Sequence, residues 1–446
     1  MGSGRRVVVW GIGGAALLAL LATVLVVVLV GGDDGPEEVW RAENVANGGG
    51  EPDVALWVHD GVVTRVGPNA GEDVTGYDAA DGTALWGIPA PEGANGPCAA
   101  SERTNAEGIG AVLYQSREVD GCLVLGVIDT RSGELLWSRD LSALEPFVST
   151  GTVTATVGQD TLTVNLSPAN VPEAFQRFDL AGGEPLPVPT ADDGCAGGWT
   201  PVTIDHADER IVTLDHCPGP SGEPSAEQRF ATHVYDAATG GLLWTRFMPD
   251  PGTGVSDVRF GEPGAPMIVV ENGKLVAYTD AGEELWRLDA DEASLAARAV
   301  ADGVLITERL TEDSSEQSEQ VVFEGYALDS GERLWSGEFP ALTSFLAADD
   351  ADDADDADDA DDADDADDAD GAGGVALLGS YFYQRGDGGQ LTLSWLDLAD
   401  GTGSEIGTVP FPLERSLIES GAALDADHLY LTGTLEQESR LRAFAR

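Results

Sequence analysis

Apolar and polar residues alternate along most of this chain in short runs, and small turn-forming residues separate the runs. A clear example covers residues 256–288, where the segments SDVRFGE, PMIVVE, KLVAYT and EELWRL follow one another, with Asn272 and Gly273 between the second and the third. Alternation with a period of two is typical of half-buried antiparallel strands, and Asn-Gly is a strong hairpin signal. The pattern therefore predicts an all-β chain made of short strands that pair as hairpins.

One phrase recurs inside this pattern and divides the chain into repeats. It reads GYDAADGTALW, VIDTRSGELLW, VYDAATGGLLW, AYTDAGEELW and YALDSGERLW in its five clear copies. Two worn copies keep the aspartate and the glycine but have Pro187 and Glu405 where the others have tryptophan. We expect the glycine to take a left-handed turn conformation and the tryptophan to anchor the outermost strand on a neighbouring sheet. Four short strands in each repeat of about 50 residues predict the blades of a β-propeller.

The two ends of the chain set the number of blades. The C-terminal segment DHLYLTGTLEQESRLRAFAR provides only the second and third strands of a repeat. The segment EEVWRAE near the N-terminus, with Trp40, provides an unclaimed fourth strand. Seven internal repeats and this closing one predict eight blades of four antiparallel strands over residues 40–446. Pairing the first strand with the last ones closes the ring without an unpaired sheet edge at the joint.

The tryptophans at the docking position of this scheme are expected to pack as core between neighbouring blades. They are Trp40, Trp86, Trp137, Trp244, Trp286 and Trp335. The repeated phrase, x-D-x-x-T-G-x-x-L-W, resembles the tryptophan-docking motif of the pyrroloquinoline quinone (PQQ) propeller family, the quinoprotein alcohol dehydrogenase-like propellers. The resemblance covers nearly all of the chain outside its N-terminal segment. Its motif is structural and is shared by enzymes and non-enzymes, so the motif alone implies no activity.

The quinone enzymes of that family use a vicinal cysteine disulfide, a calcium ion and an aspartate base. No two cysteines of this chain are closer than 22 positions, and the repeats are short, so no residue matches those sites. We therefore expect no enzyme activity, no catalytic, cofactor-binding or metal-binding residue, and no cofactor. The resemblance favours the non-catalytic members, such as outer-membrane assembly factors, which hold other proteins on a propeller face. A small-molecule-binding or sensing propeller is the alternative, and a PQQ-dependent dehydrogenase is less favoured. The arginine-rich usage, with a single lysine, also predicts a GC-rich, actinobacterial source.

The same scheme explains the four cysteines. Cys98 and Cys195 are expected to precede the first strand of a blade, and Cys122 and Cys217 to follow its second strand. In an antiparallel hairpin the start of one strand lies beside the end of the next. Among the three possible pairings this favours the disulfides Cys98–Cys122 and Cys195–Cys217. Disulfides form in oxidising compartments, which fits a domain outside the cytoplasm.

The first residues predict a membrane anchor. Arg5 and Arg6 precede an apolar run over residues 7–30, which is long enough to cross a bilayer as a helix, and acidic residues follow it. We predict a cytoplasmic stub at residues 1–6, a single transmembrane helix at 7–30, a linker at 31–39 and an extracytoplasmic propeller held at the cell membrane. A cleaved signal peptide is the rival interpretation, although no A-x-A cleavage site follows the run. A twin-arginine signal is a third.

The charge of the chain excludes one class of partner. The formal net charge is −56, so nucleic acid is not an expected partner, whereas a protein partner in the cell envelope is. A repeated Ala-Asp-Asp triplet fills residues 349–370, where other repeats have a short turn such as VADG or VHDG. Like charges at i,i+3 and the low helix propensity of aspartate predict a disordered, solvated loop between the first two strands of the seventh blade.

One hairpin gathers possible metal ligands. The segment IDHADERIVTLDHC, residues 204–217, contains aspartates, histidines and Cys217. Its spacing lacks the tight ligand pairs of zinc sites, so turn residues and a disulfide explain it better. The sequon NLS at Asn165 matches a glycosylation site, which we attribute to chance.

Overall fold

The computed structural model describes the chain in separate ranges, with gaps between them. These ranges are residues 37–42, 53–67, 73–143, 153–166, 175–189, 191, 195, 198–207, 210–217, 229–247, 258–259, 266–271, 274–288, 294–310, 320–340, 343–347, 374–380, 390–410, 421–425, 428–435 and 438–445. The predicted transmembrane segment, residues 7–30, and the acidic run, residues 349–370, lie outside them. Within the described ranges, no helix is long and apolar enough to cross a membrane.

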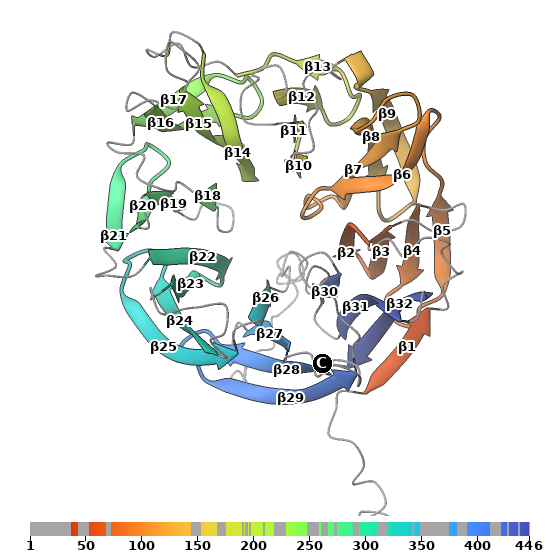
Figure 1. The fold of residues 1–446 in the computed structure, drawn as a ribbon. Helices are drawn as coiled ribbons and strands as arrows, with labels where there is room; N and C mark the ends of the chain where they lie inside the picture. The colour runs from red at the N-terminus through yellow and green to blue at the C-terminus, as the bar shows by residue number, and fades with distance from the viewer. Residues whose placement is uncertain are drawn as a thin grey trace, which may run out of the picture.

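The described residues form thirty-two strands, which pair into eight four-stranded antiparallel sheets arranged around a central axis (Figure 1). This arrangement is a β-propeller, and the prediction of an all-β chain of short hairpins is confirmed. The sheets are numbered here from 1 to 8 in the order of the ring, and each sheet runs from its innermost to its outermost strand.

The first four sheets follow chain order without exception. Sheet 1 consists of β2 (Ala55–His59), β3 (Val62–Val66), β4 (Val74–Asp78) and β5 (Ala84–Ile88), and sheet 2 of β6 (Ala94–Ala100), β7 (Ile109–Ser116), β8 (Cys122–Asp129) and β9 (Glu134–Asp140). Sheet 3 consists of β10 (Thr154–Val157), β11 (Thr161–Asn165), β12 (Phe175–Asp179) and β13 (Pro185–Leu186), and sheet 4 of β14 (Thr200–Ala207), β15 (Arg210–Cys217), β16 (Arg229–Asp236) and β17 (Leu242–Phe247).

The next three sheets repeat this order. Sheet 5 consists of β18 (Val258–Arg259), β19 (Met267–Glu271), β20 (Lys274–Tyr278) and β21 (Glu284–Leu288), and sheet 6 of β22 (Ser294–Ala301), β23 (Val304–Leu310), β24 (Gln320–Ala327) and β25 (Arg333–Pro340). Sheet 7 consists of β26 (Thr343–Ala347), β27 (Gly374–Ser380), β28 (Gln390–Asp397) and β29 (Gly403–Pro410). The acidic run lies between β26 and β27, on the connection from the first to the second strand of this sheet.

Sheet 8 joins the two ends of the chain. Its strands are β30 (Ala422–Leu424), β31 (His428–Leu435), β32 (Glu438–Ala445) and, outermost, β1 (Glu38–Ala42). Trp40 pairs with Ala443, and the Ala445 amide donates a hydrogen bond of 2.9 Å to the Glu37 carbonyl. The segment that contains Trp40 therefore completes the last sheet, as the pattern of the two ends predicts.

The first and third turns of each sheet lie on the same face of the ring. In sheet 1, the first turn joins β2 to β3 and the third joins β4 to β5, and the Ala79 amide of the third donates to the Gly61 carbonyl of the first at 2.9 Å. The same bond connects Leu328 to Gly303 in sheet 6 at 2.7 Å. We call the surface made by these two sets of turns the turn face. The start of β1 belongs to it, because Glu37 and Ala445 occupy the place of a third turn.

Five of the docking tryptophans connect their sheet to the next through one hydrogen bond. Trp335 on β25 donates from Nε1 to the Leu398 carbonyl of sheet 7 at 2.8 Å. Gly401 of the same turn has a φ of 72°, and a Cβ there would lie 2.6 Å from the indole, so only glycine allows this approach. The same donation to the next sheet is made by Trp40, Trp137, Trp244 and Trp286. Trp86 packs on the turn glycine of sheet 2, but its Nε1 has no hydrogen-bond partner among the described residues.

A β-bulge precedes every docking tryptophan of the described strands. Trp86 pairs with Gly76 and Ala84 with Tyr77, so Leu85 has no opposite residue and turns outward, 48% exposed. The equivalent residue is exposed in each of these outer strands: Val39, Leu85, Leu136, Leu243, Leu285 and Leu334. Bulges interrupt the hydrogen-bonding edge of a strand, so they protect these outer edges from pairing with another chain.

Sheet 3 docks without a tryptophan. Pro187 stands at the tryptophan position, β13 has two residues, and its pairing with β12 shows no bulge. Arg177 on β12, fully buried, fills the space instead: its Nη1 donates to the Pro187 carbonyl at 2.7 Å and its Nη2 donates to the Ala237 carbonyl of sheet 4. Gly240, the turn glycine of sheet 4, lies against this guanidinium as the other turn glycines lie against an indole. An arginine thus makes the contact that the missing tryptophan would make.

Candidate functional site

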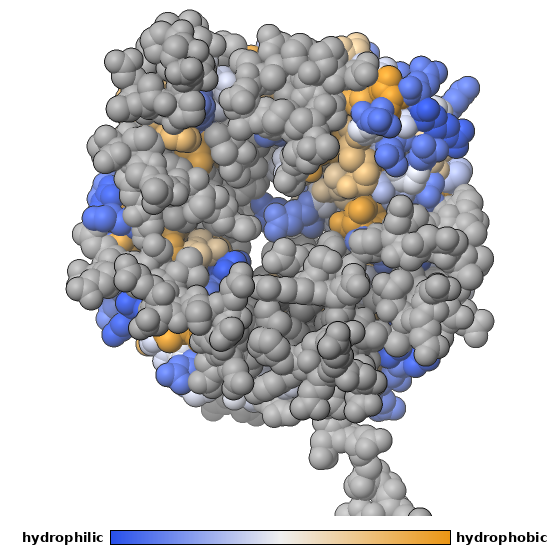
Figure 2. Space-filling view, in the orientation of Figure 1, coloured by the Kyte–Doolittle hydropathy of each residue, from blue (hydrophilic) through white to orange (hydrophobic). Residues whose placement is uncertain are grey.

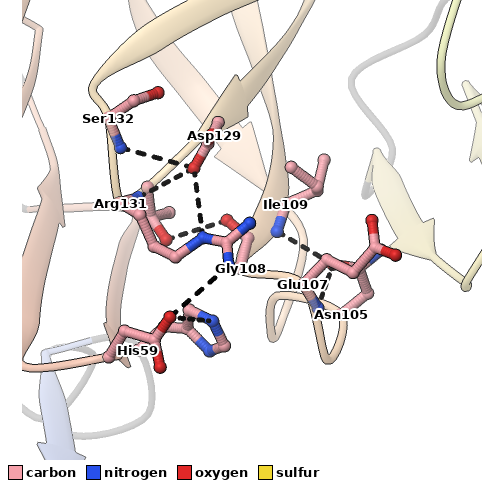
Figure 3. A network of polar contacts seen from close by, with 10 residues as sticks. His59, Asn105, Glu107, Gly108, Ile109, Asp129, Arg131 and Ser132 are labelled. Carbon is pink, nitrogen blue, oxygen red and sulfur yellow. Dashed lines mark hydrogen bonds and ion pairs between the residues drawn. The ribbon is translucent and has the colours of Figure 1, made fainter.

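The turn face carries a polar network where sheets 1 to 3 meet (Figure 3). The first turn of sheet 2, residues 101–108, is longer than the two-residue turn at the same place in sheet 1. Trp57 of sheet 1 donates from Nε1 to the Ser101 carbonyl at 3.0 Å, and Asn105 Nδ2 donates to the Gly158 carbonyl of sheet 3 at 3.2 Å. Asn105 Oδ1 also accepts the backbone amide of Ile109 at 2.9 Å. The loop is therefore attached to three sheets and held in one conformation.

Charged groups connect sheets 1 and 2 beside this loop. Arg131 lies between two carboxylates, with Nη1 3.6 Å from Asp60 Oδ2 and Nε 3.8 Å from Asp129 Oδ1. His59 Nε2 lies 3.4 Å from the same Asp60 oxygen. The His59 side chain is 8% exposed, whereas those of Asp60 and Arg131 are 45% and 47% exposed. Asp60 and Arg131 thus form an ionic surface that a partner can reach, and the buried His59 contacts Asp60.

Aspartates of the third turns give this face a fixed pattern of negative charge. Asp129 Oδ1 accepts the backbone amide of Arg131 at 2.9 Å, and Asp236 Oδ1 accepts both the amide and the hydroxyl of Thr239. Hydrogen bonds from Thr239 lower the pKa of Asp236, and those from Thr402 lower the pKa of Asp400, so both carboxylates are ionised at neutral pH. The carboxylates that cap their own turns in this way are Asp78, Asp81, Asp129, Asp179, Asp236, Asp397 and Asp400.

The centre of the ring is the second place where a ligand could bind. Figure 2 shows the molecule hollowed there, and the innermost strands of the sheets surround this hollow in Figure 1. The β6–β7 connection reaches toward it from the turn face (Figure 1). Among the described residues, no group of three or more histidine, cysteine, aspartate or glutamate side chains could hold a metal ion.

The hairpin with possible metal ligands does not bring those residues together. It forms β14 and β15, where Asp205 pairs with Val212 and Asp215 lies three ladder positions away, opposite Pro201. Asp215 instead contacts His233 of β16, with 2.5 Å between its Oδ2 and the histidine Nδ1. The side chains of Asp215 and His233 are 4% and 0% exposed, so this pair is part of the interior between sheets 3 and 4 and is closed to a substrate. His233 lies outside the hairpin motif, and only the sheet register could have revealed it.

A buried carboxylate in sheet 6 is another polar cluster that motif searching missed. Glu324 on β24, 1% exposed, accepts Arg309 at 2.7 and 2.8 Å, Arg333 at 3.1 Å and the Tyr326 hydroxyl at 2.9 Å. Burial opposes ionisation of Glu324, but the hydrogen bonds and charge of Arg309 outweigh it and lower its pKa. Burial and the Glu324 charge raise the pKa of Tyr326 to about 12. Every oxygen of this carboxylate is used internally, which identifies the cluster as a structural one.

Sheet 1 contains a similar internal ion pair. Arg65 on β3, 2% exposed, donates from Nε to Asp53 Oδ2 at 2.8 Å and lies 2.6 Å from Oδ1 through Nη2. Burial lowers the pKa of Arg65, but the charge of Asp53 outweighs it and the net pKa is raised. Burial also raises the pKa of the neighbouring Tyr77. Both partners are buried, so this pair stabilises the fold and is not accessible to a ligand.

The cysteines lie in the pairs that the hairpin geometry favoured. Cys98 and Cys122 have Cα atoms 6.0 Å apart, and Cys195 and Cys217 have Cα atoms 5.7 Å apart, each pair bonded through its sulfurs. Cys122 follows the second strand of sheet 2 and Cys195 precedes the first strand of sheet 4, as expected, whereas Cys98 lies inside β6 and Cys217 ends β15. Cys98 lies inside the strand because β6 begins at Ala94, and the pairing of β6 with β7 has two register irregularities around Pro97, which has no amide hydrogen.

The sequon is buried, and the docking tryptophans are buried or half-buried. Asn165 lies on β11, 5% exposed, so its side chain is not open to a glycosylating enzyme in this fold. Trp40 and Trp335 are 8% and 6% exposed.

A family model described as outer membrane protein assembly factor BamB matches residues 26–183 and 231–357, well over half of the chain. No curated protein matches the sequence. Among solved structures, BamB from Moraxella catarrhalis has a TM-score of 0.47 and 12% identity, covering 91% of this chain and 97% of its own.

Two dehydrogenases superimpose somewhat better. A quinohemoprotein alcohol dehydrogenase from Pseudomonas putida has a TM-score of 0.51 and 11% identity over 92% of this chain and 76% of its own. A europium-containing methanol dehydrogenase has a TM-score of 0.53 and 11% identity over 92% and 93%. At identity this low, the similarity shows a common fold and says nothing about a shared activity. The match of the family model over most of the repeats shows that this chain belongs to the PQQ-repeat propeller family described by outer membrane protein assembly factor BamB.

Proposed function

We propose that this protein is a non-catalytic scaffold of the cell envelope, anchored in the membrane by residues 7–30, and that it holds another protein on its turn face. The observation that carries the proposal is the fixed array of ionised aspartates on that face, together with the loop of residues 101–108, which three sheets hold. A rigid surface with an excess of negative charge selects partners with arginine- and lysine-rich segments and costs little entropy on binding. The assembly-factor description of the family model supports a protein-holding role.

The position of the first strand supports a particular orientation of the ring. Glu37, which precedes β1, lies on the turn face beside Ala445. If residues 7–30 span the membrane, residues 31–36 reach at most about 20 Å, since an extended residue covers about 3.5 Å. The turn face is then directed at the membrane, and its partner is a protein embedded in the membrane or lying on its outer surface. Protease added outside intact cells should cut the propeller, and protection of the whole chain would contradict this placement.

The dehydrogenase alternative is tested by titrating the full-length protein in detergent with PQQ and Ca²⁺. A ligand that binds the folded state stabilises it by about 2.7 kcal/mol at a hundredfold excess over its Kd. We expect no change in thermal stability and no oxidation of alcohols with an artificial electron acceptor. A stability gain of that size, or alcohol oxidation that requires PQQ, would overturn the non-catalytic assignment.

A further inference from the structure

The joint between sheets 3 and 4 differs in chemistry from the two joints beside it. Leu162, Val164 and Phe178 pack toward sheet 2, so the residues that alternate with them on β11 and β12 face sheet 4. Val212 and Val234 pack toward sheet 5, so their neighbours on β15 and β16 face sheet 3. The polar residues on the two facing surfaces, each at most 5% exposed, are Thr161, Thr163, Asn165, Arg177, Thr213, Asp215 and His233.

The two neighbouring joints are filled mainly with apolar side chains. Between sheets 4 and 5 the core consists of Leu214, Met267, Val269 and similar residues, and Trp244 docks there as well. Between sheets 3 and 4 the apolar part is limited to two small clusters, one around Phe175, Ile211 and Tyr235 and one around Trp199 and Cys217. Burial of apolar area contributes about 25 cal/mol per Å², whereas buried polar groups gain little net stability even when they are hydrogen-bonded. This joint is therefore weaker than its neighbours.

The turn-face end of this joint depends on Arg177 in place of an indole. Burial lowers the pKa of its guanidinium, which shows that its surroundings disfavour the charge, although Asp236 partly offsets this. Its Nε has no hydrogen-bond partner among the described residues. A buried cation bound to carbonyl groups holds less firmly than a docked tryptophan, because its own desolvation offsets the contacts it makes.

The opposite end of the joint is held by a disulfide. Cys195 lies on the connection from sheet 3 to sheet 4, and Cys217 ends β15 on the surface that faces sheet 3. Trp199 packs on Cys217 and on the half-buried Cys195, and its ring lies 5.0 Å from that of His233. The disulfide thus fixes the segment that covers the buried Asp215–His233 pair.

We propose that the Cys195–Cys217 disulfide is a redox-controlled clasp on this joint, and that its reduction opens the ring between sheets 3 and 4. A dithiol reductant attacks one sulfur, forms a mixed disulfide and then closes to its own disulfide. Two electrons and two protons pass to the cysteines, which become two thiols. Trp199 is then free to leave His233, and solvent reaches the polar surfaces. This inference does not depend on the proposed scaffold function.

The second disulfide provides a matched control within the same chain. Cys98 and Cys122 both belong to sheet 2, so their bond connects strands of one sheet and spans no joint. The joints on either side of sheet 2 have docking tryptophans, Trp86 and Trp137, and apolar cores. Reduction of Cys98–Cys122 should leave both joints closed.

Hydrogen–deuterium exchange of the full-length protein in detergent, followed by mass spectrometry with and without a dithiol reductant, tests the proposal. Reduction of the wild-type protein should speed exchange at least tenfold in peptides from β12, β15 and β16, with little change in β7, β8, β23 and β24, and reoxidation should reverse it. The C195S/C217S variant should exchange fast at the same strands without reductant, whereas C98S/C122S should need the reductant. Unchanged exchange in reduced wild-type protein, or an equal increase across all sheets, would overturn the proposal. The comparison of oxidised with reduced wild-type protein tests the proposal even if a variant does not fold.

Discussion

Gly401 offers the sharpest test of how the sheets dock. A Gly401→Ala substitution faces two penalties: its φ of 72° is unfavourable for an L-residue, and the new Cβ would lie 2.6 Å from the Trp335 indole. The left-handed conformation costs about 1–2 kcal/mol, and overpacking in a filled core typically costs about 1–3 kcal/mol more. We therefore expect the free energy of unfolding to fall by about 2–5 kcal/mol.

Gly303→Ala is the matched control for this substitution. Gly303 has a φ of 70°, and a Cβ there would meet nothing within 4 Å. The Gly303→Ala substitution should therefore lower the free energy of unfolding only by the conformational cost, about 1–2 kcal/mol. Urea unfolding of both variants, followed by tryptophan fluorescence and circular dichroism, gives the two values. If the two variants were equally stable, packing of the glycine on the indole would not be what fixes adjacent sheets.

Two further predictions concern the buried charges. Glu324 has a lowered pKa in the folded state, so its ionised form adds stability above its unfolded pKa of about 4.3, which is lost as the pH falls through the folded value. Glu324→Gln should therefore lower the thermal midpoint at pH 7 and reduce the further decline of that midpoint below about pH 4.3. If the midpoint of the variant declined at acid pH as steeply as that of the wild type, the role of this carboxylate would be refuted. Arg177→Met removes the donors to the Pro187 and Ala237 carbonyls and should lower the free energy of unfolding by about 1–3 kcal/mol in urea titrations. The exposed control Arg117→Met should change it little, and equal effects would show that Arg177 does not dock sheet 3.

The repeat phrase predicts most of this architecture because it encodes local geometry. The aspartate ends the third strand, the glycine takes a left-handed turn, and the tryptophan reaches the next sheet. Because Trp40 occupies the same position of the repeat as Trp335, the phrase also predicts the ring closure. The membrane anchor, the domain boundaries, the location and the actinobacterial source stay predictions.

Other features depend on contacts between distant strands and could not be read from the motif. Arg177 compensates for Pro187 from the neighbouring strand, at a place where other repeats have Gly76, Val127 or Ala277. A large polar residue at that position was a signal, but it has meaning only once the strand register is known. The Asp215–His233 pair was missed for the same reason, since it joins two strands with no shared motif. The bulges that expose Leu85 and its equivalents shift the register by one residue without any change in the hydrophobic pattern.

Photocrosslinking in intact cells tests the turn face most directly. A photoreactive amino acid replaces Glu107 on the turn face or, as control, Glu118 at the other end of the same sheet; both glutamates are exposed. The scaffold proposal predicts one dominant crosslinked protein from position 107, lost when added salt screens the aspartates, and little or none from position 118. Equal crosslinking from both positions, or crosslinking from position 118 alone, would contradict the assignment of the turn face as the surface that holds a partner.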